Sequence, residues 1–247
     1  MKRVNQFLNE EEEVQKENIE KKDLKENVPL IEIKNLSYHY DDSIELIFND
    51  TSLIIQKGSQ VAFQGRTGAG KTTLFRLLTG LVEPSSGSIK ICGIEVKKIP
   101  SSLKCELFGY VSQGFQKVPG TIKDQITLKD PSITQEQVEK AMKQVFLDDY
   151  VKNEIKGGYD QKFEENLFSR GQLQLLSFAR AIVTNPEILL LDEISANLDT
   201  DSEKKLLLAI QNLKDKKTVL CISHRLNEAL SFSSVISVEN QKLNPQK

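Results

Sequence analysis

Gly65-Arg66-Thr67-Gly68-Ala69-Gly70-Lys71-Thr72 matches the pattern G-x-x-x-x-G-K-[ST]. A short apolar run over 60–64 precedes it, and apolar residues at helical spacing follow it over 74–81. The predicted order is therefore strand, glycine loop, helix. In this order, backbone N–H groups of the loop curl around phosphate oxygens, and the helix turns its positive end toward them. We expect the chain to bind a nucleoside triphosphate; a glycine-rich turn with a chance lysine is the alternative.

The loop also predicts individual roles. Lys71 is expected to bridge the β- and γ-phosphates, which makes it a catalytic candidate, and the hydroxyl of Thr72 is expected to ligate Mg²⁺. The predicted nucleotide-binding residues here are Gly65, Arg66, Thr67, Gly68, Ala69, Gly70, Lys71, Thr72 and Thr73.

A second motif is the apolar strand 188–191 that ends in Asp192 and Glu193. A carboxylate at the end of a strand beside the phosphate loop is typical of a residue that helps to hold Mg²⁺, so Asp192 is predicted at the metal. Glu193 would project toward the γ-phosphate, where a carboxylate polarises an attacking water. The alternative is an Asp-Glu pair that only closes a strand.

The rest of the chain predicts an α/β fold with a largely parallel sheet, because apolar strands alternate with helical patterns. The spacing of Thr200 and Glu203 fits a capping box. The stretch 114–183 has few strand signals and is predicted to be an inserted helical subdomain, whereas alternation from Ile31 onward predicts antiparallel strands. Strands are expected near 109–112, 188–192 and 218–223, and helices around 138–146, 173–183 and 203–213.

Composition narrows the class of protein. The chain has 247 residues, 38% hydrophobic and 28% charged, with 33 Lys+Arg against 35 Asp+Glu, so a polyanion-binding protein is disfavoured. No apolar run approaches the roughly 20 residues of a membrane helix. Residues 1–29 are dense in charge and are expected to be a linker or arm, with the folded domain at 30–247. The N-terminus lacks the features of a secretory signal, and Cys92, Cys105 and Cys221 are expected to be reduced.

Phe168-Ser169-Arg170-Gly171-Gln172, about twenty residues before Asp192, resembles the LSGGQ signature of ATP-binding cassette (ABC) ATPases. The resemblance extends in register over about 31–243. It implies a P-loop NTPase (RecA-like) core with a mostly parallel sheet, an antiparallel β subdomain and an inserted helical subdomain. It also implies an ATPase that uses ATP and Mg²⁺.

Single residues gain roles from this resemblance. Tyr40 matches the position of the aromatic residue that stacks on adenine in this family. For Tyr38, a place in the hydrophobic core is the simpler expectation. Gln113 resembles the Q-loop glutamine, a catalytic and Mg²⁺-side residue, and His224 resembles the catalytic switch histidine. Asp199, at the end of 196–199, resembles the D-loop aspartate.

The family pairs two such domains head to tail around two ATP molecules. Ser169, Gly171 and Gln172 would then face the nucleotide of the opposite subunit. The implied partners are a second ABC ATPase domain, identical or different, and a transmembrane domain, fused or separate, at the cytoplasmic face of the membrane. No nucleic-acid partner is expected.

The subfamily is indicated by 118–126, which resembles the passage after the Q-loop in exporters, and by 3–14, which resembles the linker after the last membrane helix of fused half-transporters. An excised or trimmed domain is therefore expected, with no regulatory domain after it. Against an exporter, the loop before the signature is short and lacks a glycine-flanked glutamate. The sequence departs from the family at Phe168 and Arg170 in the signature and at Asn197 in the D-loop.

Two other readings stay open. One is a soluble ABC ATPase that acts on ribosomes or DNA, although the chain lacks the tandem cassettes or long coiled-coil insert that mark most of these. The other is a low-turnover regulatory cassette of a heterodimer, which the joint presence of Gln113, Glu193 and His224 disfavours.

Overall fold

The computed structural model describes residues 19–40, 43–112, 114–194, 198–214, 216–223, 230, 232 and 234–246. Within these residues the chain forms two sheets. The six-stranded sheet has the order β10-β9-β3-β8-β7-β6 and is parallel except for the pairing of β10 with β9. The four-stranded sheet has the order β2-β1-β4-β5 and is antiparallel. The predicted α/β fold class is confirmed.

The strands are β1 (Ile31–Tyr38), β2 (Phe48–Ile55), β3 (Gln60–Gln64), β4 (Ser86–Ile91), β5 (Ile94–Glu95), β6 (Phe108–Val111), β7 (Ile188–Asp192), β8 (Thr218–Ile222), β9 (Ser234–Glu239) and β10 (Lys242–Gln246). The α-helices are α2 (Lys71–Thr79), α3 (Ser101–Leu107), α4 (Ile122–Thr127), α5 (Gln135–Gln144), α6 (Asp148–Asn153), α7 (Arg170–Ile182) and α8 (Thr200–Lys214). Short 3-10 turns are η1 (Lys21–Asp23), η2 (Val96–Lys98), η3 (Gly158–Asp160) and η4 (Glu165–Leu167).

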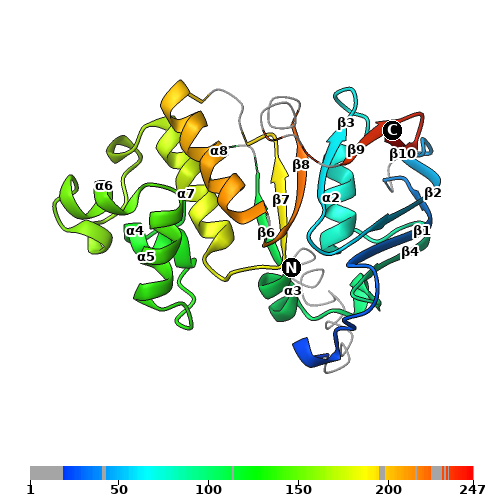
Figure 1. The fold of residues 1–247 in the computed structure, drawn as a ribbon, viewed down its shortest axis with the longest axis horizontal. Coiled ribbons are helices and arrows are strands. Elements are labelled where there is room, and N and C mark those ends of the chain that lie inside the picture. The colour runs from blue at the N-terminus through cyan, green and yellow to red at the C-terminus, as the bar shows by residue number, and fades with distance from the viewer. Residues whose placement is uncertain are drawn as a thin grey trace, which may run out of the picture.

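The six-stranded sheet separates two hydrophobic cores. Figure 1 shows the helices α4 to α8 on one side of its strands β6 to β8, and α2 with the antiparallel sheet on the other. Successive side chains of a strand point to opposite faces. In β7, Leu189 and Leu191 therefore pack into the core formed with the helices α4 to α8, whereas Ile188 and Leu190 pack into the core formed with α2 and the antiparallel sheet. Burial on both faces explains why this strand is a continuous apolar run.

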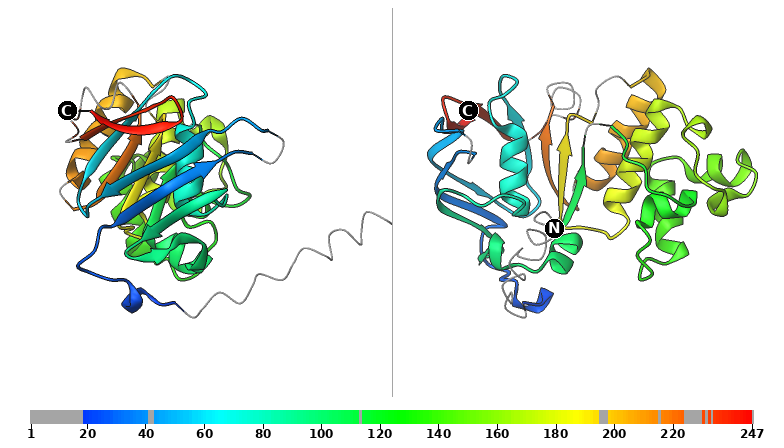
Figure 2. Two further views of the ribbon diagram at one scale, coloured as in Figure 1. Left: turned by 90° about the vertical axis from the view of Figure 1, so that its right-hand side faces the viewer. Right: turned by 180° about the vertical axis from the view of Figure 1, so that it is seen from behind.

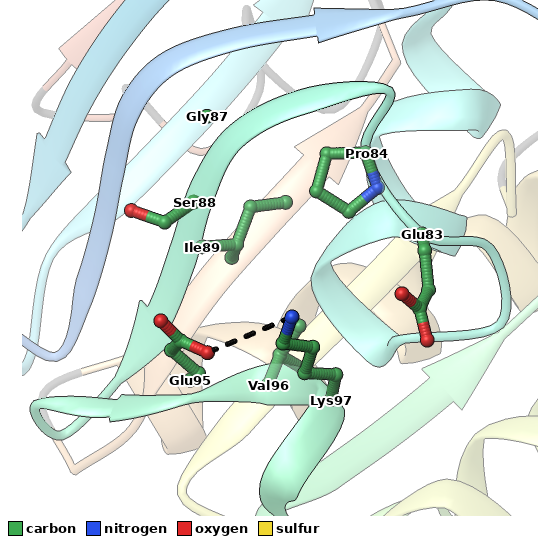
Figure 3. Close-up of a pocket in the computed structure, with 8 residues that line it drawn as sticks. All are labelled: Glu83, Pro84, Gly87, Ser88, Ile89, Glu95, Val96 and Lys97. Atoms are coloured by element: carbon green, nitrogen blue, oxygen red, sulfur yellow. Dashed lines mark ion pairs between the residues drawn. The ribbon is translucent and has the colours of Figure 1, made fainter.

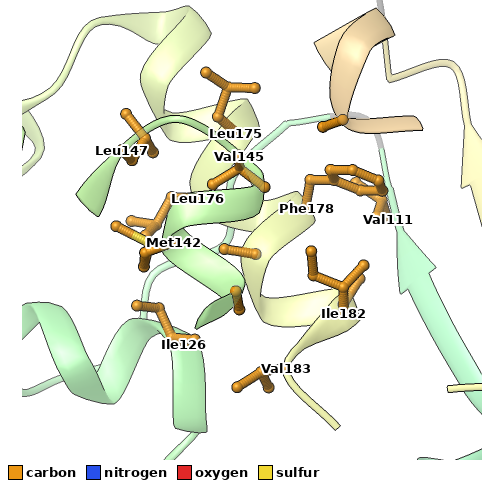
Figure 4. Close-up of a cluster of buried hydrophobic side chains, with 14 of the residues drawn as sticks. Val111, Ile126, Met142, Val145, Leu147, Leu175, Leu176, Phe178, Ile182 and Val183 are labelled. Carbon is orange, nitrogen blue, oxygen red and sulfur yellow. The ribbon is translucent and has the colours of Figure 1, made fainter. Parts of the chain in front are cut away.

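The helical side is built around α7. Its apolar residues recur at helical spacing and are buried against α4, α5 and β6, as Figure 4 shows for Leu176, Phe178 and Ile182. The side chain of Arg180 leaves this face and donates to the backbone carbonyls of Gln125 and Gln116. These bonds tie α7 to α4 and to the segment that follows β6.

The C-terminal hairpin joins the two sheets. Leu243 N–H donates to the hydroxyl of Thr51 at 2.9 Å, and the ammonium of Lys242 donates to the carbonyl of Asp50 at 2.7 Å, both in β2. Figure 2 (left) shows this red hairpin beside the blue strands of the antiparallel sheet. Near the other end of the chain, Ile19 and Leu24 pack against the core formed with α2 and the antiparallel sheet. The described part of the charged arm therefore contacts the domain.

One local prediction is wrong. Thr200 is the first residue of α8 and not its cap. Asp199 caps the helix instead, because its carboxylate accepts hydrogen bonds from the N–H of Ser202 at 2.9 Å and from the Ser202 hydroxyl at 2.7 Å. An aspartate one residue earlier offers the stronger acceptor for the free N–H groups of the first turn.

Candidate active site

The phosphate loop joins β3 to α2, as the sequence predicts. Gly70 caps α2 with a φ of 99°, in the left-handed region that L side chains rarely adopt. A Cβ at this position would also collide with the side chain of Ile47 and approach the ring of Phe48 to 3.2 Å. The loop therefore lies directly against the start of β2, and Gly70 is required for that approach.

Lys71 folds back over the loop. Its ammonium donates to the carbonyl of Gly65 at 2.8 Å and to that of Arg66 at 3.0 Å. The cation thus lies beside the N-terminus of α2, where unpaired N–H groups and the helix dipole also favour negative charge. This is the arrangement an anion-binding loop needs.

Asp192 ends β7 beside the loop and is 7% exposed. The hydroxyl of Thr72 donates to its Oδ1 at 3.4 Å, and the hydroxyl of Tyr110 in β6 donates to its Oδ2 at 3.1 Å. Strand order brings these groups together, because β6 pairs with β7 and β3 lies two strands away on the other side. Asp192 and Thr72 are therefore neighbours, as predicted.

Burial dominates the electrostatics of this cluster. It raises the pKa of the Asp192 carboxyl above its ordinary value, while the hydrogen bonds from Thr72 and Tyr110 act in the opposite direction. Burial, followed by the charge of Asp192, also raises the pKa of the Tyr110 phenol. The phenol therefore stays protonated and remains a donor at neutral pH.

The donor set fits Mg²⁺. This ion prefers oxygen ligands and is commonly held by one or two protein groups together with substrate phosphates and water. Thr72 supplies a hydroxyl and Asp192 a carboxylate, and the two side chains are already in contact beside the phosphate loop. These residues could hold the ion next to a bound nucleotide.

Glu193 follows Asp192 in an unusual backbone conformation. Its φ is 53°, in the left-handed region, and its N–H donates to the carbonyl of Ile222 in β8 at 2.9 Å. Its side chain is exposed. This conformation turns the chain sharply at the end of β7, and nine other non-glycine residues in the described part of the chain, such as Asn185, also have a positive φ.

Tyr40 lies over the first turn of α2. Its hydroxyl hydrogen-bonds with the hydroxyl of Thr73 at 3.1 Å and accepts from Arg76 at 3.4 Å. It borders a cavity of about 440 Å³ that also touches Gly68 and Ala69 of the loop. That volume is within the range of small-molecule sites, roughly 300–1,000 Å³. Tyr38, by contrast, is buried in the core.

A second hollow lies away from this site. Figure 3 shows a pocket beside β4 and η2, with an ion pair of 3.9 Å between Lys97 and Glu95. Its volume is about 90 Å³, which is too small for a nucleotide, and none of its lining residues belongs to the phosphate loop or β7.

The signature segment begins α7. Ser169 is the N-cap: its hydroxyl accepts from Gln172 N–H at 3.1 Å, and the Gln172 side chain accepts from Ser169 N–H at 2.8 Å. Gly171 is buried against the start of α8, where a Cβ would collide with Ser202 and approach Asp199 Oδ2 to 2.6 Å. The side chain of Arg170 is exposed. An arginine where the family has glycine therefore needs no space inside the domain.

Phe168 is 7% exposed and belongs to an aromatic cluster. Its ring stacks on the ring of Phe163, with the centroids 5.8 Å apart. It also forms an edge-to-face pair with the ring of Tyr150, with the centroids 5.8 Å apart. Phe163 in turn contacts Phe115, over which the guanidinium of Arg180 lies at 4.9 Å from the ring centroid. The departure from leucine thus has a packing partner in this chain.

Several predicted residues fall outside the described part of the chain, namely Gln113, Asn197 and His224. The phosphate-loop residues and the pair of Asp192 and Glu193 follow the carboxyl ends of β3 and β7, where Thr72 contacts Asp192. A separate group, where α7 meets α8, consists of Ser169, Gly171, Gln172 and Asp199. Sequence reasoning missed Tyr110, because its contact with Asp192 depends on the order of the strands.

None of the helices in the described ranges has both the length and the apolar character needed to cross a membrane. A family model described as "ABC transporter" matches residues 48–196. Over 219 residues the chain is 37% identical to a Bacillus subtilis protein described as the uncharacterized ABC transporter ATP-binding protein YwjA. Over 212 residues it is 35% identical to a putative multidrug export ATP-binding/permease protein of Staphylococcus aureus.

A solved structure of a bacterial Atm1-family ABC exporter with ATP bound is similar to this fold, with a TM-score of 0.78 and 28% sequence identity over 88% of the chain. The chain is shorter than the proteins it matches. It covers 38% of the exporter chain, 38% of the Bacillus protein and 36% of the Staphylococcus protein, while 87% and 85% of this chain align with the latter two.

Proposed function

Because this chain belongs to the ABC transporter family and contains that family's ATP-binding domain, we propose that it binds ATP with Mg²⁺ and hydrolyses it to drive export by a membrane domain. The observation that carries the proposal is the cluster of Lys71, Thr72 and Asp192 at the phosphate loop. ABC ATP-binding domains are generally ATPases. Hydrolysis by this chain is the proposed step.

The loop and its neighbours bind the nucleotide. Residues 65–73 surround the phosphates with backbone N–H groups and the Lys71 ammonium, and Tyr40 stacks on the adenine. Support for Tyr40 comes from its place over α2 and beside the 440 Å³ cavity. Thr72, Asp192 and Gln113 are the proposed residues around Mg²⁺, which when bound neutralises phosphate charge.

Glu193 is the proposed general base. It takes a proton from water as the water oxygen bonds to the γ-phosphorus and the bond between that phosphorus and its bridging oxygen breaks. Gln113 and His224 complete the proposed catalytic set around the γ-phosphate. Support comes from the position of Glu193 in the sequence, directly after the buried carboxylate of Asp192 at the end of β7.

The test of this step is Glu193→Gln, which keeps size and removes the basic oxygen. We expect ATP turnover to fall by about 10²–10⁴-fold, while ATP affinity stays within a few-fold of the original. Glu165→Gln, an exposed carboxylate in η4, is the matched control and should retain turnover. Persistent hydrolysis in Glu193→Gln would refute the assignment.

The second proposed unit is the dimer. Ser169, Gly171, Gln172 and Asp199 would contact the nucleotide held by a second ABC ATPase domain, so two ATP molecules lie between two domains. The N-terminus of α7 supports this, since a helix start favours an anion. Light scattering of Glu193→Gln should give a monomer alone and a dimer with ATP. A protein that binds ATP but stays monomeric would contradict a homodimer.

We also propose the cellular context of the chain, from the names of its relatives and from the exporter-like passage at 118–126. The chain would form the ATPase domain, 30–247, with a helical subdomain over about 114–183 and an arm over 1–29. Its partner would be a transmembrane domain of an exporter, at the cytoplasmic face of the membrane. Fractionation of source cells tests this context, because the chain should sediment with membranes and recovery only in the supernatant would contradict it.

A further inference from the structure

The two oxygens of the Asp192 carboxylate have different donors. Oδ1 accepts from the hydroxyl of Thr72 at 3.4 Å, on the side of the phosphate loop. Oδ2 accepts from the hydroxyl of Tyr110 at 3.1 Å, on the side of β6. Thr72 and Asp192 are residues expected at Mg²⁺, whereas no motif of the sequence gives Tyr110 a role.

The sheet holds Tyr110 in this place. Tyr110 pairs with Leu190 in the parallel register of β6 and β7, and residues two apart on a strand share a face, so Tyr110 lies on the same face as Asp192. Its ring meets the edge of Phe75 in α2 at 6.4 Å with an interplanar angle of 80°. The ring therefore packs against α2 through Phe75 and bonds to Asp192 through its hydroxyl, while the residue remains 41% exposed.

We propose that Tyr110 is a positioning residue for Mg²⁺, which holds Asp192 by Oδ2 and so leaves Oδ1 directed to the metal and Thr72. The terminal torsion of an aspartate is broad, and one hydrogen bond to a single oxygen narrows it. Partners of this kind orient metal ligands, and their loss typically lowers metal affinity by about 10–100-fold. This inference rests on the proposed binding of ATP with Mg²⁺.

The decisive variant is Tyr110→Phe in the full chain, because it removes the hydroxyl and keeps the ring against Phe75. The measurement is the affinity for AMP-PNP, a non-hydrolysable ATP analogue, by calorimetry in EDTA and at a series of Mg²⁺ concentrations. We expect the affinity in EDTA to stay within twofold. The Mg²⁺ concentration that gives half of the gain in affinity should rise about tenfold.

Tyr150→Phe is the matched control. It also removes a tyrosine hydroxyl, one that donates to the carbonyl of Leu167 at 2.6 Å in the helical region, and it should leave the response to Mg²⁺ unchanged. Tyr110→Leu is a second test variant that lacks both ring and hydroxyl, and it should show at least the tenfold rise.

An unchanged Mg²⁺ response in either Tyr110 variant that folds would overturn the inference. So would an equal loss of affinity in EDTA and in Mg²⁺, because that pattern indicates a purely structural role for Tyr110. The original protein separates this result from the proposed function: if it binds no AMP-PNP at any Mg²⁺ concentration, the proposed function fails and the inference fails with it.

Discussion

Replacement of Gly171 by alanine sets two opposite effects against each other. Alanine is the better helix former, and inside an exposed helix the change would stabilise by roughly 0.5–1 kcal/mol. Here the new Cβ would collide with Ser202 and lie 2.6 Å from a carboxylate oxygen of Asp199. Such overpacking costs typically 1–3 kcal/mol.

The displaced groups add a further cost, since Asp199 and Ser202 make the cap of α8 and loss of a cap costs about 1 kcal/mol. The net expectation for Gly171→Ala is a loss of about 2 kcal/mol in the free energy of unfolding, measured by urea titration with circular dichroism. Arg170→Ala, at the neighbouring exposed position, should change it by less than about 0.5 kcal/mol. Stabilisation in Gly171→Ala would refute the packing argument.

Three further predictions concern residues away from the nucleotide. Phe168→Leu introduces the residue that the family usually has at this position. It should lower the free energy of unfolding by about 1 kcal/mol, because the ring contacts of the aromatic cluster are lost. A higher free energy of unfolding in urea titration would contradict this. Tyr159→Phe should lower it by about 1.5–3 kcal/mol, since the hydroxyl donates at 2.6 Å to buried Asp148, and an unchanged urea midpoint would count against it. Hydrogen bonds from Thr121 hold the pKa of Asp124 below its ordinary 3.8, so the ionised carboxylate stabilises the fold above that pH and this contribution is lost as pH falls through the lowered pKa. The stability difference between the original protein and Asp124→Asn, measured from pH 7 down to pH 3, should therefore shrink toward the acid end, and a constant difference would disprove the pH argument.

The parallel core was predictable because its strands are buried on both faces and read as continuous apolar runs. β7 and β8 appear where the sequence places them, and α2 ends at Gly80, which adopts the left-handed conformation of a helix end. The antiparallel pairing of β1 with β2 was visible in alternation. The order of the strands was not, since the sequence does not say which apolar run lies beside which.

The candidate site likewise has a part that the sequence predicts and a part that it does not. The phosphate loop and the pair of Asp192 and Glu193 come from local motifs that carry their own chemistry. Two other features depend on elements that are far apart in the chain. They are the hydrogen bond from Tyr110 to Asp192 and the close packing of Gly171 against Asp199. Sequence spacing gives no information on such contacts, and only the packed structure brings them out.

The contact between Gly171 and the start of α8 has a mechanical consequence. With 13 residues, α7 is about 20 Å long, so a tilt of 10° about its C-terminal end would move Ser169 by about 3.5 Å. The starts of α7 and α8 are closely packed, because the space beside Gly171 is too small even for a Cβ, which would collide with Ser202 and lie 2.6 Å from Asp199 Oδ2. A tilt of α7 toward α8 would therefore press Gly171 on Ser202 and Asp199 and displace the start of α8.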